Sequence, residues 1–452
     1  MIRNSEELIA RPTSPRLQAM RRDALAIFEA GLKAVDPRNA IAAHLRRQGE
    51  VLHVDGLELD LGRYECVRLI AFGKASVAMT KALLERVQVD EGLVVSDQEE
   101  GFEAPGMVVV QAGHPHPNEG SFQGGEKALK IVRKCGPRDL LLVLLSGGGS
   151  AMLEYTDMPL EDLREVSDLL LKSGMDIGKL NTVRKHLSDI KGGRLGKEAA
   201  ARGAEVVTIA ISDVVGDQTS FIASGPTVPD ETTFLDAKKV LQDFGLWDLV
   251  PDAVRRRIEA GAGGMIPETP KPGDSAFARS RYFIVASNGM ACRAAAEEAR
   301  KRGYEPIILT TRLQGEAREV AHVLAAIARS VDEGLSLPKP GAIIVGGETT
   351  VTVRGGGTGG RNQELVLAAV PYLEDQEIVM MSCGTDGLDG STDAAGAIAD
   401  AETLQRALKL GMNPADYLAD NDSHRFFQKL GDAIITGPTG TNVMDLQVIL
   451  IG

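Results

Sequence analysis

Three consecutive glycines, Gly147, Gly148 and Gly149, follow an apolar run and precede Ser150 in the segment LLSGGGSAM. Backbone N–H groups of adjacent glycines at the end of a strand can form an anion-binding nest, which the dipole of a following helix strengthens. A tight turn between a strand and a helix needs fewer glycines. We therefore predict that Gly147, Gly148, Gly149 and Ser150 bind phosphate rather than form only a turn.

Lys74 could supply a cation for the same anion. It lies in the segment IAFGKA (residues 70–75), where a glycine separates a strand from a helix. A lysine at the start of a helix meets the positive end of the helix dipole, which is unfavourable. Either its side chain faces solvent, or an anion shared with the helix offsets the penalty. Beside the glycine-rich loop the second interpretation is favoured, and Lys74 is predicted to be catalytic.

Arg361 and Glu348 lie in a third glycine-rich stretch, GGETTVTVRGGGTGGRNQE (residues 346–364). Part of it has Walker A spacing, but Arg361 and Asn362 stand where that motif requires Lys and Ser or Thr, which excludes a P-loop NTPase. Arg361 is predicted to be a second anion-binding cation, because its planar fork suits carboxylate or phosphate. Glu348 follows two glycines and is either a base, a metal ligand or a surface residue.

Carboxylates in two further loops could bind a metal ion or accept a proton. Asp213 follows the apolar run Val206–Ile211, and Asp386 is the first aspartate of the loop SCGTDGLDGSTDAAGA. Carboxylates in such positions suit Mg²⁺ or a general base near phosphate. We predict Asp213 and Asp386 as metal ligands, with Asp389 and Asp393 as helpers, although Asp beside Gly is also a common turn residue.

Two groups of polar residues are assigned no chemistry. The helical segment before Asp213 carries Asn181, Arg184, Lys185 and Lys191. Such charges usually belong to an ordinary solvated helix. His114 and His116 lie between prolines and lack further metal ligands nearby, so a rigid loop near the mouth of a site is expected.

These motifs need a scaffold that aligns the ends of strands. Apolar runs rich in β-branched residues alternate with helical patterns along the chain. The expected strands are residues 68–72, 92–96, 107–111, 140–145, 206–211, 282–286, 306–309, 342–345, 378–382 and 448–451. This alternation predicts an α/β fold with mostly parallel sheets and flanking helices. Ligands of such sheets bind at the carboxyl ends of the strands.

The length of 452 residues exceeds what one hydrophobic core usually supports, so we expect two domains. The segment Ala262–Ala276 is rich in Pro and Gly and is the best linker. We therefore predict an N-terminal Rossmann-like α/β domain over residues 1–265 and a C-terminal α/β domain over residues 275–452. The active-site cleft is expected between them.

Composition excludes several classes of protein. A net charge of −13 argues against a nucleic-acid partner. The four cysteines lie far apart in the sequence, and no two of them form a CxxC motif. This spacing indicates reduced thiols. We find no signal peptide and no apolar run of membrane-spanning length, and we predict a cytoplasmic protein without a membrane partner. The oligomeric state stays open, a homodimer included.

The order of several motifs resembles the class II glycerate kinases, which are glycerate 2-kinases with a C-terminal MOFRL domain. These motifs are GKAS, GHPHPNEGS, LLSGGGSAM, SDVVGD with SGPT, GGETTVTV with GGRNQE, GTDGLDGSTDAAGA and ITGPTGTNV. The resemblance covers nearly the whole chain. It implies that ATP and a divalent cation such as Mg²⁺ phosphorylate D-glycerate at the 2-hydroxyl, giving 2-phosphoglycerate and ADP. It also implies that Lys74 and Arg361 are the essential lysine and arginine of the family. Ser391 departs from the proline of many relatives.

The expected mechanism depends on alignment and on neutralising the charge of the transferred group. The glycine loop would hold ATP phosphates, with Lys74 and Arg361 on the phosphoryl group or the glycerate carboxylate. The base is left open among Asp386, Glu348 and Asp213.

Two other functions compete with the kinase. An NAD(P)-dependent hydroxypyruvate reductase is the alternative, because sequences of this kind often carry that label. It requires a GxGxxG turn, whereas Gly147–Met152 matches only G-x-G-x-x-M. A nucleotide- or sugar-phosphate-sensing module would not need cations and an aspartate loop in both halves of the chain.

Overall fold

The computed structural model describes residues 1–97, 102–331, 337–374 and 376–452. The chain forms two compact units, each described by itself. Unit 1 comprises residues 1–39 and 286–452, and unit 2 comprises residues 40–285. The division thus differs from the expected linker, because Ala262–Ala276 lies inside unit 2 and the first 39 residues belong with the C-terminal part of the chain.

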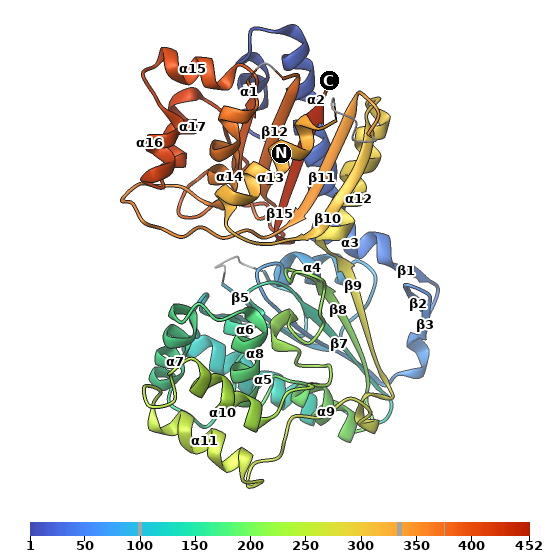
Figure 1. The fold of residues 1–452 in the computed structure, drawn as a ribbon. Helices are drawn as coiled ribbons and strands as arrows, with labels where there is room; N and C mark the ends of the chain where they lie inside the picture. Colours follow the sequence, from blue (N-terminus) through green and yellow to red (C-terminus); the bar gives the residue numbers. More distant parts are fainter. Residues whose placement is uncertain (98–101, 332–336, 375) are drawn as a thin grey trace. The chain divides into compact units, whose positions relative to one another are not determined.

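Unit 2 is built on a six-stranded sheet in the order β6-β5-β4-β7-β8-β9 (Figure 1). Its strands are β4 (Cys66–Phe72), β5 (Glu91–Ser96), β6 (Met107–Gln111), β7 (Asp139–Leu145), β8 (Glu205–Ile211) and β9 (Ser280–Ala286). The pairs β5–β6, β4–β5, β4–β7 and β7–β8 are parallel, as expected. A small antiparallel sheet, β1 (Leu45–Gln48), β2 (Val51–Val54) and β3 (Leu57–Asp60), precedes it.

The core of unit 2 follows from the apolar character of its central strands. Every residue of β7 is buried. Val143 and Leu145 of β7 pack with Leu129 of α5 and Leu195 of α9. The helices of this unit are α4 (Ser76–Leu84), α5 (Glu119–Arg133), α6 (Gly149–Met152), α7 (Leu160–Lys172), α8 (Ile177–His186), α9 (Arg194–Ala201), α10 (Phe234–Asp243) and α11 (Asp252–Ala262), and α3 (Pro37–His44) spans its first boundary. Such burial on both faces is typical of parallel sheets.

Unit 1 contains a second six-stranded sheet in the order β10-β11-β15-β12-β13-β14. The strands are β10 (Glu305–Leu313), β11 (Gly341–Gly347), β12 (Ile378–Gly384), β13 (Gly396–Asp400), β14 (Ala433–Ile434) and β15 (Asp445–Ile451). Only β10–β11 is a parallel pair, and the other four pairs are antiparallel. A mostly parallel sheet was expected here. The difference arises because two strands are reversed: β15 runs antiparallel between β11 and β12, and β13 runs antiparallel between β12 and β14.

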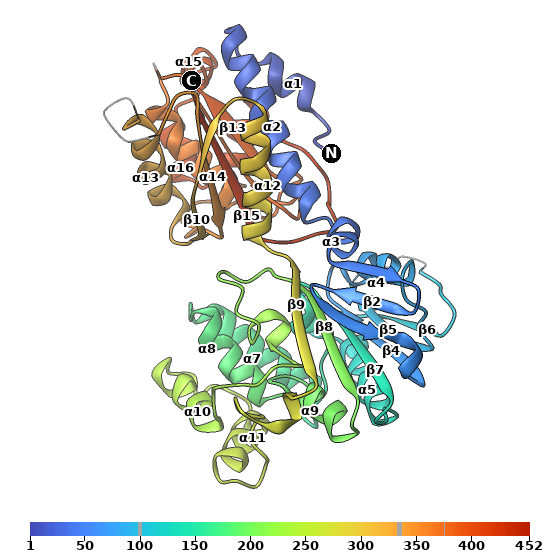
Figure 2. The ribbon, with the colours of Figure 1, turned by 90° about the vertical axis from the view of Figure 1, so that its right-hand side faces the viewer.

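Helices cover both faces of this sheet. On one face, Leu324 of α13 (Ala317–Arg329) and Leu365 of α14 (Arg361–Ala369) pack against Ile343 and Ile449. The other face packs against α2 (Pro15–Ala34) and α12 (Asn288–Lys301), which lie side by side (Figure 2). The short helices α1 (Ser5–Ala10), α15 (Thr403–Lys409), α16 (Pro414–Ala419) and α17 (Ser423–Leu430) complete the unit.

Arg21 explains why the N-terminal helix α2 belongs to unit 1. Its fully buried guanidinium donates to Asp400 at 2.5 Å and to Asp432 at 2.7 Å. Leu25 and Phe28 of the same helix enter the core beside β15. The amphipathic pattern of residues 15–35 thus predicted the helix, whereas its partners lie about 400 positions further along the chain.

The four cysteines are free thiols, as predicted; three are buried and Cys66 is half-buried. In the described ranges, no helix combines the length and the apolar character needed to cross a membrane.

Candidate active site

Three strands of unit 2 end at one edge of the sheet and bring their loops into contact. Lys74, after β4, donates its backbone N–H to Gly147 O at 2.9 Å, and Ala75 N–H donates to Ser146 Oγ at 3.0 Å. Gly73 has φ +114°, and a Cβ atom there would lie 2.4 Å from Ser146 Oγ. Only glycine permits this approach, so the local sequence GK is needed to join the two loops.

The glycine-rich loop presents unused donors beside a carboxylate. The backbone N–H groups of Gly147 and Gly148 donate no hydrogen bond within the part of the chain that the structure describes. A Cβ atom on Gly147 would lie 2.5 Å from Asp213 Oδ2, so Asp213 flanks the loop directly. Two adjacent free N–H groups form the kind of nest that binds an anion. The predicted residues Gly147, Gly148 and Asp213 are therefore brought together.

Lys74 and Asp213 influence each other electrostatically. The Lys74 ammonium makes no hydrogen bond or ion pair with any described residue. Burial raises the pKa of Asp213, and Lys74 partly opposes this by favouring the charged carboxylate. Burial and the Asp213 carboxylate also raise the pKa of the Tyr282 hydroxyl. The site thus combines a cation that pairs with no described residue and a carboxyl group whose proton is held more tightly than usual.

His114 lies next to the same loop. A Cβ atom on Gly148 would be 2.9 Å from His114 Cδ2. Burial lowers the pKa of His114, and the nearby charges of Lys74 and Arg184 lower it further. Burial and the two nearby cations thus disfavour the protonated form of His114. We expected this loop only near the mouth of a site; the structure places it against the glycine loop.

A chain of three buried or half-buried polar side chains starts at Ser150. Ser150 Oγ lies 2.8 Å from Ser224 Oγ, and Ser224 Oγ donates to Asn181 Oδ1 at 2.7 Å. Ser224 and Asn181 are buried, and Ser150 is half-buried. Ser224 has φ +59° and its neighbour Ala223 has φ +48°, which non-glycine residues adopt rarely.

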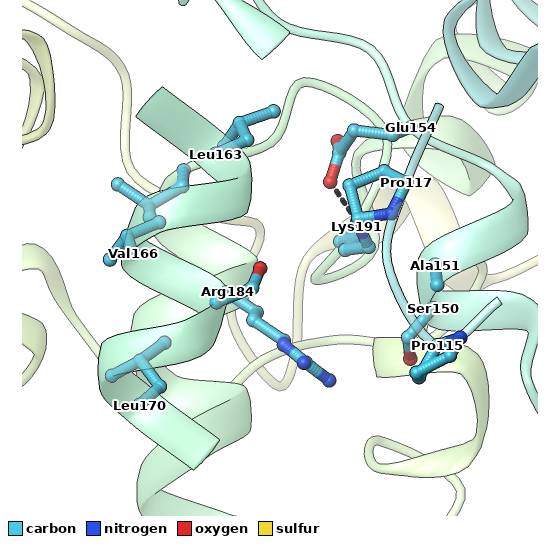
Figure 3. Close-up of a pocket in the computed structure, with 12 residues that line it drawn as sticks. Pro115, Pro117, Ser150, Ala151, Glu154, Leu163, Val166, Leu170, Arg184 and Lys191 are labelled. Atoms are coloured by element: carbon cyan, nitrogen blue, oxygen red, sulfur yellow. Dashed lines mark hydrogen bonds and ion pairs between the residues drawn. The ribbon is translucent and has the colours of Figure 1, made fainter. Parts of the chain in front are cut away.

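A small pocket lies beside Ser150, between α6, α7 and α8 (Figure 3). Its volume is about 20 Å³. It is lined by Pro115, Pro117, Ser150, Ala151, Glu154, Leu163, Val166, Ser167, Leu170, Arg184, Leu187 and Lys191. Figure 3 shows the Arg184 side chain extending from α8 toward Ser150 and Pro115. The sequence had suggested only an ordinary solvated helix for Arg184.

Arg184 differs from the two lysines near it. Lys185 pairs with Asp230 at 3.2 Å, and Lys191 pairs with Glu154 (Figure 3). The Arg184 guanidinium has no such partner among the described residues. Burial lowers its pKa, with Glu154 opposing this from a distance.

Arg361 of unit 1 is held by two carboxylates. At the start of α14, its Nε and Nη2 donate to Asp445 at 2.6 Å and 2.9 Å, and its Nη1 lies 2.9 Å from Glu348. Burial lowers the pKa of Arg361, but Asp445 and Glu348 outweigh this effect and raise it. The predicted residues Arg361 and Glu348 are thus in contact, with the guanidinium fixed in orientation.

The aspartates of the loop after β12 have separate roles. Asp389 is buried and accepts the N–H groups of Asn362 at 3.0 Å and Gln363 at 2.8 Å, so it stabilises the start of α14. Asp393 is 79% exposed and lies 3.6 Å from His424. Asp386 is half-buried, and its carboxylate accepts one hydrogen bond that the structure records, from Leu388 N–H at 3.2 Å. Asp386 and Asp393 therefore have carboxylates largely available to a ligand, whereas Asp389 does not.

The two predicted metal ligands, Asp213 and Asp386, belong to different units. Across the described residues, no group of three or more His, Cys, Asp or Glu side chains is arranged to hold a metal ion. Mg²⁺ in phosphoryl-transfer sites commonly takes one or two carboxylates, with phosphate and water oxygens completing its shell. The single Asp213 carboxylate beside the glycine loop fits that mode of binding, not an all-protein cage.

Two family models match the chain. Residues 23–259 match DUF4147, a domain of unknown function, and residues 341–445 match the MOFRL family.

Named relatives cover almost the whole chain. A glycerate 2-kinase of Pyrococcus horikoshii is 40% identical over 93% of this chain and 94% of its own length. The crystal structure of glycerate kinase from Thermotoga maritima has a TM-score of 0.83 and 38% identity, with 96% of this chain and 100% of that chain covered. An Agrobacterium vitis protein named as a hydroxypyruvate reductase is 40% identical over 94% of this chain and 93% of its own length.

Proposed function

The chain belongs to the class II glycerate kinase family with a MOFRL domain, and from this membership we propose that it transfers phosphate from ATP to the 2-hydroxyl of D-glycerate. The products are 2-phosphoglycerate and ADP. One observation carries the proposal: at the ends of adjacent parallel strands, Lys74, whose ammonium pairs with no described residue, adjoins a loop with two N–H groups that donate to no described residue, and its charge acts on the Asp213 carboxyl. Ligands of α/β sheets bind at this edge.

The glycine loop binds phosphate oxygens of ATP in this proposal. The N–H groups of Gly147 and Gly148 act as fixed donors that need no reorganisation. Lys74 neutralises the charge spread over the transferred phosphoryl group, which is the main demand of this reaction. Because Lys74 pairs with no carboxylate among the described residues, its charge is available to the transition state.

Asp213 is the proposed base of unit 2. Its raised pKa makes it a better proton acceptor than an exposed aspartate, and its position beside Gly147 places it next to the bound phosphate. Glu348 is less suited, because it already pairs with Arg361. Asp386 of unit 1 stays a second candidate for the base and for a metal ligand.

A divalent cation fits this scheme as a partner of the nucleotide. When bound, it neutralises phosphate charge and aligns the phosphate oxygens. Asp213 and Asp386 are the proposed carboxylate ligands, each from its own unit. Arg361 is proposed to stabilise the transferred phosphoryl group through its fixed guanidinium.

A direct assay tests the function. Purified protein is incubated with D-glycerate and Mg-ATP, and phosphorus NMR identifies the phosphorylated position. A parallel sample receives hydroxypyruvate and NADH or NADPH, because a relative carries the reductase name. We expect ADP and 2-phosphoglycerate in the first sample. Oxidation of the reduced nucleotide without any phosphoryl transfer would establish the reductase instead.

A further inference from the structure

Arg184 is a cation held in a half-buried position without a counter-ion among the described residues. The neighbouring acid, Glu154, is engaged with Lys191 and accepts from Ser188 Oγ at 2.5 Å. Removing a charge from water without a partner is costly, so such a position is retained only when something else offsets the cost. An anionic ligand seated against Arg184 would do so, since the guanidinium presents a fork of donors that matches a carboxylate.

The hydroxyl of Ser150 is directed by the residues behind it. A serine hydroxyl has one proton to donate. Ser224 Oγ donates its proton to Asn181 Oδ1 at 2.7 Å. The 2.8 Å hydrogen bond between the two serine hydroxyls therefore requires Ser150 to donate to Ser224. Ser150 Oγ then has only lone pairs to offer to a ligand. It can accept a hydrogen bond from a ligand hydroxyl, but it cannot donate to a phosphate oxygen.

Backbone conformation supports a functional reason for this arrangement. Ala223, Ser224 and Gly225 all have positive φ values, of +48°, +59° and +59°. Two of them are not glycines, and such conformations cluster at ligand-binding and catalytic sites. The result of this turn is that Ser224 Oγ lies between Ser150 and Asn181.

We propose that Arg184 and Ser150 form the acceptor subsite, in which Arg184 binds the carboxylate of a small hydroxy acid and Ser150 accepts a hydrogen bond from its hydroxyl that is not phosphorylated. The choice of hydroxyl rests on the proposed kinase function. Ser150 cannot serve as the base, because its proton chain ends on the neutral amide of Asn181. It therefore orients the hydroxyl that keeps its proton, which for a 2-kinase is the 3-hydroxyl.

The pocket beside Arg184 and Ser150 has a volume of about 20 Å³, which is too small for a nucleotide base. It can take one end of a small hydroxy acid, but not the whole molecule. In this proposal Ser150 has a role other than the predicted binding of phosphate. The phosphate nest is confined to the free N–H groups of Gly147 and Gly148, and the serine belongs to the acceptor.

The carboxylate contact is tested with Arg184→Met. Arg256→Met is the matched control, because Arg256 is exposed on α11 and makes no interaction with another described side chain. Losing a charged hydrogen-bond donor should raise KM for D-glycerate about 10- to 100-fold, with KM for ATP changed less than about twofold. An increase confined to ATP would assign Arg184 to the phosphates and overturn the proposal. Unchanged constants for both substrates would also overturn it.

Binding measurements separate this subsite from the kinase reaction. Calorimetry compares D-glycerate with glycerol, which lacks the carboxylate, in wild-type protein and Arg184→Met. We expect the wild type to bind D-glycerate at least about 10-fold more tightly than glycerol, and the variant to lose this preference. If the wild type binds D-glycerate through Arg184 without phosphorylating it, the proposed function fails and the subsite stands. If the preference survives in Arg184→Met, the subsite fails.

The hydroxyl contact is tested by selectivity. D-Lactate lacks the 3-hydroxyl but keeps the carboxylate and the 2-hydroxyl. The ratio of its Kd to that of D-glycerate should fall about 10-fold in Ser150→Ala, because only D-glycerate loses a hydrogen bond. Ser224→Ala frees the Ser150 proton and should reduce the ratio less. An unchanged ratio in Ser150→Ala, with circular dichroism confirming the fold, would show that Ser150 does not contact the hydroxyl.

Discussion

The Asp445 carboxylate accepts two hydrogen bonds from Arg361, at 2.6 Å from Nε and 2.9 Å from Nη2, while Asp445 itself is completely buried. Asn362 Nδ2 adds a third at 3.0 Å. Arg361 is therefore a fixed guanidinium whose remaining edge meets Glu348. Its substitution should affect stability as well as chemistry.

Removing Arg361 should destabilise the protein. Arg361→Met leaves Asp445 buried without its charged partner, which should lower the free energy of unfolding by about 3 kcal/mol. Urea unfolding measures this change. In the double variant Arg361→Met/Asp445→Asn the loss should be smaller than in Arg361→Met alone, because the uncompensated charge is gone. Additive losses would mean that the two residues do not act as a pair.

Replacing Arg361 by lysine isolates the chemical step. Arg361→Lys keeps the charge but loses the two-pronged geometry, so we expect kcat to fall at least about 10-fold with the affinity for ATP little changed. Steady-state kinetics at saturating ATP measure this. If kcat stays at the wild-type value and only KM for D-glycerate rises, Arg361 anchors the substrate equally in ground and transition states.

Asp445 could not be found from the sequence by the rule that led to the other carboxylates. That rule looks for polar residues after buried strands, whereas Asp445 is the first residue of β15. Because β15 is antiparallel to its neighbours, Asp445 pairs in register with Gly347 and Gly384, the last residues of β11 and β12. The rule assumes parallel strands, and it failed where one strand was reversed.

The strand-end rule worked well in unit 2, where the sheet is parallel. It places Lys74, the glycine loop and Asp213 at the ends of neighbouring strands, and their loops are in contact in the structure. Arg184 was missed for a different reason. The sequence of a helix does not show whether a charged side chain on it has a counter-ion. The absence of a partner among the described residues, which makes Arg184 informative, is visible only in three dimensions.

Lys74 should be essential for turnover and unimportant for folding. Lys74→Ala should lower kcat at least about 100-fold, because the charge on the transferred group loses its proposed partner. The melting temperature should change little, since the ammonium forms no hydrogen bond or ion pair with another described residue. Lys172→Ala, at the exposed end of α7, is the control for loss of one positive charge. Near-normal turnover in Lys74→Ala would remove this residue from the mechanism.

Activity should depend on a divalent cation. We expect this because Asp213 lies beside N–H groups that donate to no described residue and are suited to binding phosphate. Excess EDTA should abolish turnover, and added Mg²⁺ should restore it. Full turnover in EDTA would contradict the metal part of the scheme. The melting temperature without nucleotide should not respond to EDTA, because the described residues hold no cluster of three metal-binding side chains.

Asp213 should show opposite effects on stability and activity. Burial raises its pKa above the ordinary value of 3.8, so in the folded state the charged form is disfavoured. The stabilising contribution of the protonated carboxyl is complete below about pH 3.8 and is lost as the pH rises through the folded pKa. At pH 7 to 8 the neutral variant Asp213→Asn should therefore melt about 1–2 °C higher than the wild type.

The same variant should lose catalysis. A loss of activity together with a gain in stability would show that the buried carboxylate is kept for function. If Asp213 accepts the hydroxyl proton, Asp213→Asn should lower kcat at least about 100-fold, since general bases contribute that much or more. The gain in melting temperature should shrink as the pH falls toward 4, because the wild-type carboxyl then becomes protonated. Calorimetric scans from pH 4 to pH 8, with kcat measured alongside, test both effects. A variant that is less stable than the wild type at pH 7 would mean that attraction to Lys74 outweighs burial. A stable variant with normal kcat would leave Asp386 as the candidate base.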